Sequence, residues 1–363
     1  MYPEIGFNEY DTSKYIAEFL QSINVEIITG IAHTGVIGVI KGNPGTSSIA
    51  IRADMDCLNV TEHTGLEYSS KNVGLMHACG HDGHMAALLG LAKYMSTYKH
   101  KLRNNLIFIF QPAEEGPGGA QLIVNSGQLE KFNIKAVLGM HIFPEIKQGM
   151  IGCCSGPLTA RNAEIDIVIT GKSGHGALPH TGIDSILATS QLLECIQTIV
   201  SRRIDPRENA VISFGKIYGG EARNIIAGKV TIEGTIRAFS KEIYDLIKES
   251  MITICDGIGK ANNCEINVEI RDMYPEVCND NDLFNILLQA AGEENVEVIK
   301  PLMISEDFSY YRQIAPELMF LLGSKNDACG YNYPLHNSKF NFDENILIKA
   351  VSVFSNMIDI LDK

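Results

Sequence analysis

Eight consecutive residues, His77 to His84, contain five side chains that can bind a divalent metal ion. They read His-Ala-Cys-Gly-His-Asp-Gly-His. Cys79 and His81 place a thiolate and an imidazole, both ligands that suit Zn²⁺, two residues apart. A solvated His-rich turn would have the same composition. The rest of the chain must therefore supply the remaining ligands and a base.

Three predicted strands, 48–53, 106–110 and 136–138, lead into side chains that can bind a metal ion or carry a proton. They are followed, in turn, by Asp54 and Asp56, by Glu114 and Glu115, and by His141. Predicted helices between these strands indicate βαβ units and a largely parallel sheet. Because the carboxyl ends of parallel strands share one edge of a sheet, we expect these side chains to converge with Cys79 and His81.

Metal-assisted cleavage of an amide is the chemistry that such a set would support. At neutral pH this reaction needs an activated water, stabilisation of the oxyanion and a proton for the leaving amine. Water on a metal has a pKa of about 7, and two ions about 3.5–4 Å apart can hold nucleophile and carbonyl together. Glu114 and Glu115 suit a division of labour, in which one binds metal and the other transfers the proton. His336 is a further candidate ligand, provided that its segment folds back onto the sheet.

Four short motifs follow the order found in one known family. The motifs are Arg52-Ala-Asp-Met-Asp56, His77-Ala-Cys-Gly-His-Asp82, Gln111-Pro-Ala-Glu-Glu-Gly116 and Gly139-Met-His141. In these motifs the chain resembles the aminoacylase/carboxypeptidase-like amidohydrolases. These are dinuclear metallopeptidases that include hippurate hydrolases, indole-acetyl-amino-acid hydrolases and N-acetyldiaminopimelate deacetylases. The similarity extends over essentially the whole chain, including 171–176 and 234–237.

The resemblance implies a role for each candidate residue of the centre. Two divalent ions per subunit, Zn²⁺ or Mn²⁺ with Co²⁺ or Ni²⁺ as further options, would be bound by Cys79, His81, Glu115, His141 and His336. Cys79 would bridge the two ions, and Glu114 would be the general base. Asp54 occupies the position that supports catalysis in the family. Asp56 is a rival for that role, and the sequence does not separate the two.

Three residues in the second half of the chain complete the predicted site. By the resemblance, His175 stabilises the oxyanion, in related enzymes sometimes across a subunit boundary, and Asn224 contacts the substrate carboxylate. Arg237 can bind the same carboxylate through a bidentate pair. The alternative interpretations are a loop histidine without a role and a structural arginine on a strand.

We predict an α/β protein with a mainly parallel-sheet catalytic domain of metallo-exopeptidase type. This domain comprises residues 1–157 and 271–363. Near Gly156 and Pro157 the pattern changes to a βαββα-type block, which we interpret as an inserted α+β domain over residues 158–270. The resemblance implies that the insert is a dimerisation domain and that the protein is a homodimer.

Composition excludes two classes of partner. The formal net charge of −13 argues against nucleic acid and anionic membrane surfaces, because both require a basic surface. The nine cysteines form no CxxC pair, which favours free thiols in a reducing compartment. With no apolar run of 18 residues, no membrane span is predicted, and we expect a cytoplasmic protein.

We therefore predict a metal-dependent amidohydrolase that deacylates N-acyl amino acids. Candidate substrates are N-acetyl-diaminopimelate, hippurate-like compounds and other N-acyl amino acids. The alternatives are a metallo-dipeptidase or carboxypeptidase, a cysteine hydrolase with Cys79 activated by His81, and a non-catalytic metal-binding homologue.

Overall fold

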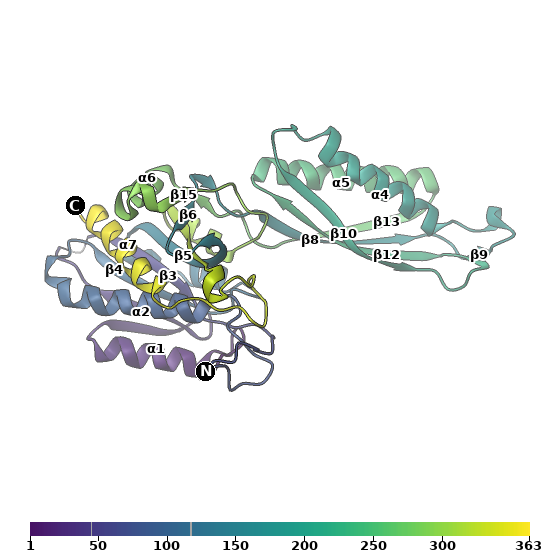
Figure 1. Ribbon diagram of the computed structural model, residues 1–363. Helices are drawn as coiled ribbons and strands as arrows, with labels where there is room; N and C mark the ends of the chain where they lie inside the picture. Colours follow the sequence, from purple (N-terminus) through teal and green to yellow (C-terminus); the bar gives the residue numbers. More distant parts are fainter. Residues whose placement is uncertain (45, 117) are drawn as a thin grey trace. The chain divides into compact units, whose positions relative to one another are not determined.

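The computed structural model describes residues 1–44, 46–116 and 118–363. The chain forms two compact units (Figure 1). Unit 1 comprises Met1–Leu158, Val277–Lys300 and Asp307–Lys363, and unit 2 comprises Thr159–Glu276 and Pro301–Glu306. Unit 2 is therefore inserted into the sequence of unit 1.

Unit 1 is built on an eight-stranded mixed sheet in the order β1-β2-β4-β3-β5-β16-β6-β15. Its strands are β1 (Glu26–Ile31), β2 (Gly35–Ile40), β3 (Ser48–Asp54), β4 (Asn105–Gln111), β5 (Ile134–Lys147), β6 (Ile151–Cys153), β15 (Val296–Val298) and β16 (Glu317–Lys325). The central strands β4, β3, β5 and β16 pair in parallel. Every residue of β3 is buried, as expected for a parallel strand covered on both faces. The predicted mainly parallel α/β architecture is confirmed.

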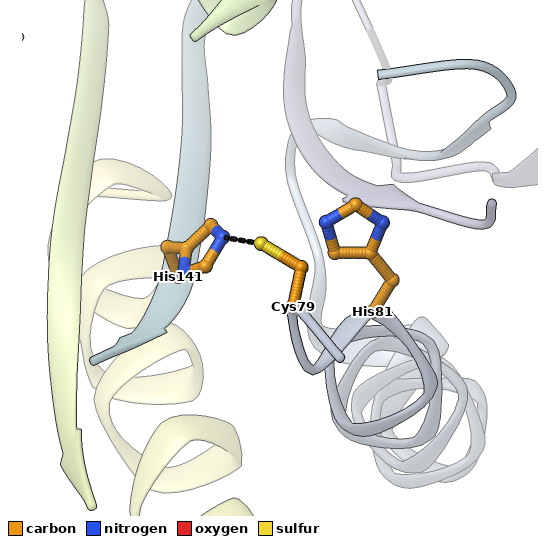
Figure 2. Close-up of side chains that lie close together, drawn as sticks. All are labelled: Cys79, His81 and His141. Atoms are coloured by element: carbon orange, nitrogen blue, oxygen red, sulfur yellow. Dashed lines mark hydrogen bonds between the residues drawn. The ribbon is translucent and has the colours of Figure 1, made fainter. Parts of the chain in front are cut away.

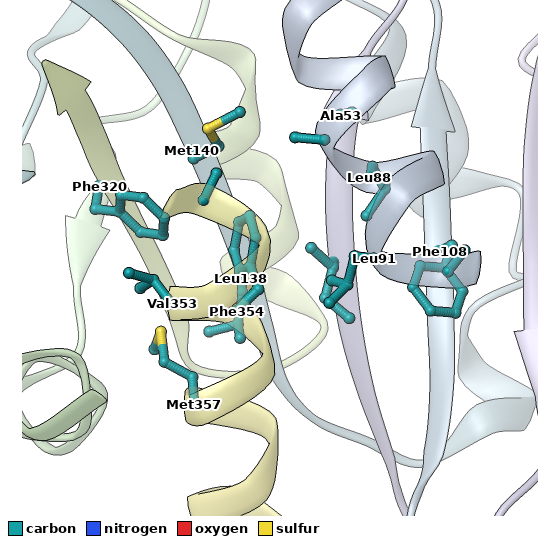
Figure 3. Packing of buried hydrophobic residues seen from close by; sticks show 14 of the residues in the cluster. Ala53, Leu88, Leu91, Phe108, Leu138, Met140, Phe320, Val353, Phe354 and Met357 are labelled. Atoms are coloured by element: carbon teal, nitrogen blue, oxygen red, sulfur yellow. The ribbon is translucent and has the colours of Figure 1, made fainter. Parts of the chain in front are cut away.

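Helices cover this sheet and enclose the core of unit 1. They are α1 (Tyr10–Ser22), α2 (His81–Tyr98), α3 (Gly119–Asn125), α6 (Asn281–Ala291) and α7 (Ile346–Leu361). Helix α2 packs against α7 and β3. Figure 3 shows Leu88 and Leu91 of α2 in the same apolar cluster as Phe354 and Met357 of α7. This packing fixes the beginning of α2, where His81 lies.

Strand β5 is longer than the predicted strand at 136–138 and runs from Ile134 to Lys147. Its pairing with β3 ends at Gly139, whereas its pairing with β16 continues past His141 to Phe143. His141 therefore lies inside the strand and not at its end. The extension depends on β16, which is distant in sequence, so the local pattern could not indicate it.

Unit 2 is an α+β unit with a four-stranded antiparallel sheet in the order β10-β12-β8-β13. Its main elements are β8 (Arg161–Thr170), α4 (Ser185–Arg202), β10 (Ala210–Gly219), β12 (Lys229–Ala238), α5 (Lys241–Asn262) and β13 (Glu265–Asp272). Alternate residues of β8, among them Ile165 and Ile167, are fully buried in a core that α4 and α5 complete. Both helices begin at a side-chain cap, on Asp184 and Ser240 respectively. In Figure 1 the two helices lie side by side along the sheet.

The division between the units differs in detail from the predicted 158–270 insert. Residues 301–306 belong to unit 2 because Thr159 forms a bridge with Leu302, and the amide of Ala160 donates to the carbonyl of Ile304 at 2.8 Å. Unit 2 also keeps residues 271–276, since β13 extends to Asp272. Both additions arise from pairing between segments more than 100 residues apart.

None of the helices in the described part of the chain has the length and apolar character needed to span a membrane.

Candidate metal centre

The beginning of α2 presents two of the predicted ligands. Cys79 and His81 flank Gly80, whose φ of +86° is readily adopted only by glycine. Both side chains are buried. Figure 2 shows Cys79 between the two histidines, with its Sγ 3.3 Å from Nε2 of His141.

Backbone carbonyls orient both histidines for metal binding. Nδ1 of His81 lies 3.0 Å from the carbonyl oxygen of Asp56, and Nδ1 of His141 lies 2.7 Å from that of Ile142. A carbonyl can only accept, so each Nδ1 carries the proton and each Nε2 is left as the ligand atom. Nε2 of His81 is buried and has no hydrogen-bond partner among the described residues. A bound cation would satisfy this atom.

The electrostatics around His81 favour positive charge. Burial alone would disfavour its protonated form, but Asp54 and Asp56 raise the pKa of His81 to about 10. Burial, together with Glu115 and Glu114, raises the pKa of the Cys79 thiol well above its ordinary value. A thiolate at this position therefore needs a cation beside it.

The loop after β4 brings the two glutamates to the centre. The carboxylate of Asp56 accepts from the backbone amides of Glu114 at 3.1 Å and Glu115 at 3.0 Å. Oε1 of Glu115 then lies 3.3 Å from Nε2 of His336 and 3.9 Å from Nε2 of His81.

His336 comes from the last part of the chain and has a φ of +65°. Its amide donates to the carbonyl of Ala78 at 2.8 Å, which ties this segment to the Cys79 loop. The Glu115 carboxylate beside it raises the pKa of His336. The folding back that the prediction required is therefore present.

All five predicted ligands are brought together. Within each of three groups, the ligand atoms lie within 4.8 Å of one another. The groups are Cys79, His81 and His141; Cys79, Glu115 and His336; and His81, Glu114 and Glu115. The first two share Cys79, and sulfur, imidazole and carboxylate donors suit Zn²⁺ and similar divalent ions. The residues present fit a metal centre of more than one ion.

Asp54 and Asp56 have different surroundings. Asp56 contacts His81 and holds the amides of both glutamates. Asp54 lies 2.7 Å from Nδ1 of His84 and 2.7 Å from a guanidinium nitrogen of Arg52. Burial alone would raise the pKa of Asp54, but His81, His84 and Arg52 hold it well below its usual range. Asp54 also lies 3.6 Å from Nε2 of His81, so both aspartates contact this ligand, and Asp56 in addition holds the amide of the candidate base Glu114.

His84 uses both ring nitrogens within the protein, because its Nε2 also accepts from the amide of Ile142 at 2.9 Å. It therefore supports the strand that carries His141.

The sequence reasoning missed the buried partners of Arg52. Its guanidinium lies 2.8 Å from Oε1 of Gln111 and 2.9 Å from Oδ1 of Asp307. Asp307 also accepts from the side-chain amide of Gln111 and from the backbone amide of Ala120. Arg52 and Gln111 each begin one of the four motifs, and this position was the signal in the sequence that could have indicated their role. The network joins the ends of β3 and β4.

Unit 2 carries the other predicted residues. His175 is exposed on β9 (Gly174–His175) and pairs with Ile225 of β11 (Ile225–Ile226). The amide of Gly176 donates to the carbonyl of Asn224 at 2.8 Å, so His175 and Asn224 are neighbours.

Arg237 lies apart from these two residues. Arg237 is close to the end of β12. The strand β9, which carries His175, follows the end of β8 at Thr170, and Thr170 pairs with Lys229 at the beginning of β12. Eight residues of strand separate Lys229 from Arg237, about 27 Å. Arg237 donates to the carbonyl of Ile236 at 3.0 Å and to the Thr235 hydroxyl, and burial lowers its pKa.

Fold and site together define a class of protein. A mainly parallel α/β sheet with a Cys/His/Glu centre and an inserted antiparallel unit is the architecture of a metal-binding hydrolase. The sequence model for peptidase family M20/M25/M40 matches residues 50–360. The chain belongs to this family and is a hydrolase that acts on amide bonds.

Its relatives include proteins named as deacetylases. The chain is 38% identical to the N-acetyl-L-cysteine deacetylase of Bacillus subtilis, over 96% of this chain and 83% of that protein. It is also 38% identical to the N-acetyldiaminopimelate deacetylase of Bacillus cytotoxicus, over 98% of this chain and 94% of that protein. Among solved structures, the B. subtilis YXEP protein, a dinuclear metal-binding peptidase of the M20 family, matches with a TM-score of 0.87. The identity is 32%, over 99% of this chain and 94% of that chain.

Proposed function

We propose that this protein is a dinuclear metal-dependent amidohydrolase that releases the acyl group from N-acyl amino acids. The observation that carries the proposal is the pair of ligand groups sharing Cys79, with Glu114 beside them. The names of the relatives supply the substrate class: one acts on N-acetyl-L-cysteine and another on N-acetyldiaminopimelate.

Each residue of the centre has a part in this proposal. Two divalent ions would be held by Cys79, His81, Glu115, His141 and His336, and Cys79 is common to two of the ligand groups. Bound there, the ions supply Lewis acidity that lowers the pKa of water and polarises an acyl carbonyl. Glu114 takes the proton from the attacking water and delivers it to the departing amide nitrogen. Asp56 holds the amide of Glu114 and keeps His81 in its ligand tautomer. Asp54 supports the centre through His84 and Arg52.

The cysteine-hydrolase alternative finds little support. A nucleophilic cysteine needs a lowered pKa, whereas burial and two neighbouring carboxylates raise that of Cys79. Metallo-dipeptidase activity is the remaining alternative of the same reaction class, and a panel of dipeptides tests it.

Removal of metal tests the proposed function. Dialysis against a strong chelator should abolish hydrolysis of N-acetyl-L-cysteine, N-acetyldiaminopimelate or hippurate. Addition of Zn²⁺, Mn²⁺ or Co²⁺ should restore it. Full activity in protein shown by elemental analysis to be metal-free would refute the proposal.

Unit 2 supplies the substrate-binding residues of the proposal. His175 stabilises the oxyanion, and its neighbour Asn224 binds the carboxylate of the amino acid. Because Arg237 lies at the other end of β12, it is too far from Asn224 to bind the same carboxylate within one chain, and we propose it as a carboxylate ligand across the subunit boundary of the homodimer proposed below. The test compares the KM for an N-acyl amino acid with the KM for its amide. The wild type should have the lower KM for the free carboxylate, Asn224→Ala should remove this preference, and Arg237→Met should weaken it. Unchanged preference in either variant would remove that residue from the proposal.

We propose a homodimer formed through unit 2. Of the two edge strands, β13 presents Glu265, Glu269 and Arg271, charges that discourage edge pairing. The other edge strand, β10, exposes Ile217 and Tyr218. The charge on this strand, Lys216, pairs with Glu233 of the neighbouring β12, and the exposed apolar side chains beside it fit the same strand of a second copy. Light scattering should give a dimer for the wild type and a monomer for Ile217→Lys; a monomeric wild type would contradict the proposal.

A further inference from the structure

The loop that carries Glu114 and Glu115 depends on an unusual backbone conformation. Ala113, directly before the pair, has a φ of +55°, a backbone conformation that residues other than glycine rarely adopt. Such a conformation persists only where the surrounding structure imposes it. The amides of Glu114 and Glu115 are held by Asp56, but the amide of Ala113 has a different partner.

That partner is Glu9, near the beginning of the chain. Oε1 of Glu9 accepts from the amide of Ala113 at 2.9 Å, and Oε2 accepts from the hydroxyl of Thr34 at 2.6 Å. The side chain is fully buried. Burial raises the pKa of Glu9, and the hydrogen bonds from Thr34 and Ala113 oppose that rise by stabilising the carboxylate.

The local structure does not require this side chain. Glu9 is the N-cap residue of α1 but makes no side-chain capping bond. Glu4 does so instead, accepting from the amides of Asp11 at 3.2 Å and Thr12 at 2.8 Å. The two glutamates of the N-terminal segment therefore have separate tasks. Glu4 secures α1, and Glu9 reaches a loop 104 residues away.

The same segment packs closely against both loops of the centre. A Cβ added at Gly6 would lie 2.8 Å from Cβ of Ala113 and 3.6 Å from the carboxylate of Asp56. The carbonyl of Glu4 accepts a hydrogen bond of 2.9 Å from the amide of Cys57, the residue that follows Asp56. Residues 4–9 therefore contact both loops of the centre.

We infer that Glu9 is a positioning residue: through the amide of Ala113, its carboxylate holds the loop that aims Glu114 and Glu115. The inference rests on the proposed roles of those two glutamates. Glu9 itself touches neither a ligand nor substrate.

Three variants of the full chain test the inference. Glu9→Ala removes the acceptor, and Glu9→Gln keeps a carbonyl oxygen that can accept from Ala113. Glu4→Ala is the matched control, because it also removes a carboxylate with two hydrogen bonds from the same segment. The readouts are kcat, KM and melting temperature, together with Zn²⁺ affinity from chelator competition without substrate.

We expect Glu9→Ala to lower kcat and Zn²⁺ affinity by about 10–100-fold, the usual loss when a supporting hydrogen bond near a metal is removed. KM should change much less. Glu9→Gln should stay close to the wild type, and Glu4→Ala should lower only the melting temperature. Unchanged kcat and Zn²⁺ affinity in Glu9→Ala would overturn the inference. An equal loss in Glu9→Gln would do so as well, because the charge and not the hydrogen bond would then matter.

If Glu9→Ala does not fold, the variant Gly6→Ala is used instead. Its added methyl group would lie 2.8 Å from Cβ of Ala113 and should displace the same loop. It should lower kcat and Zn²⁺ affinity, and wild-type values would overturn the inference. A wild type that binds Zn²⁺ but hydrolyses no N-acyl amino acid contradicts the proposed function instead. In that case the Zn²⁺ affinities still test the role of Glu9.

Discussion

The metal centre of unit 1 and the His175 segment of unit 2 both carry proposed site residues, but they are built in opposite ways. In the centre, Cys79 and His81 are buried, and the carboxylates of Glu9 and Asp56 accept from three successive amides of the loop that carries Glu114 and Glu115. His175 is exposed on a two-residue strand held by backbone pairing with Ile225. The comparison teaches that the ligand geometry is imposed by the packing of several distant segments. His175 is placed by local contacts: its backbone pairing and a hydrogen bond of 3.1 Å from the amide of Ala177 to its Nδ1. In the first region, changes to the ligands and to the buried side chains that support them should disturb stability and metal binding, whereas a change of the candidate base Glu114 should disturb catalysis. Changes in the second region should disturb catalysis only.

The largest effect is expected at Glu114. Glu114→Gln keeps the shape of the side chain but removes the base, so kcat should fall by about 10²–10⁴-fold. Metal content should remain that of the wild type, because Glu114 is not a proposed ligand. Steady-state kinetics and elemental analysis check both points, with the exposed Glu130→Gln as control. Wild-type turnover in Glu114→Gln would favour another base or a non-catalytic protein.

The second prediction concerns the free energy of unfolding and the buried Arg52 of unit 1. Arg52→Met leaves Asp54 and Asp307 as buried carboxylates without their cation, which should cost about 3–5 kcal/mol in the free energy of unfolding. Arg271 in unit 2 also pairs with several carboxylates but on the surface, so Arg271→Met should change stability little. Urea denaturation of both variants measures the difference. Equal losses would mean that burial does not distinguish the two networks.

The third prediction concerns catalysis and the exposed His175 of unit 2. His175→Ala removes the proposed oxyanion donor and should lower kcat by about 10²–10³-fold. Because the side chain is exposed, the melting temperature and Zn²⁺ affinity should not change. His180→Ala, another exposed histidine of the same unit, is the control and should retain full activity. A fall in Zn²⁺ affinity in His175→Ala would break the proposed division between the two regions.

Much of the centre could be predicted because its chemistry lies in short motifs. Cys79 and His81 stand at the beginning of a helix, and Glu114 and Glu115 follow a strand, that hydrophobic patterning indicates. His141 follows the predicted strand 136–138, although in the structure it lies inside the longer β5. The positions of Asp54 and Asp56 were equally clear, but their roles were not. Both carboxylates contact His81, Asp54 at Nε2 and Asp56 at Nδ1, and only the packing of α2 against β3 shows this arrangement.

By itself, the sequence determined which side chains can bind metal, which segments are buried strands and that an α+β block interrupts the main domain. These features depend on composition and on periodicities of a few residues, which are local properties. The tertiary structure decided that β5 continues past His141, that His336 meets Glu115 and that Glu9 holds Ala113. The physical reason is that each of these contacts joins segments about 100 to more than 200 residues apart. Their formation depends on how whole strands and helices pack, and no local pattern encodes it.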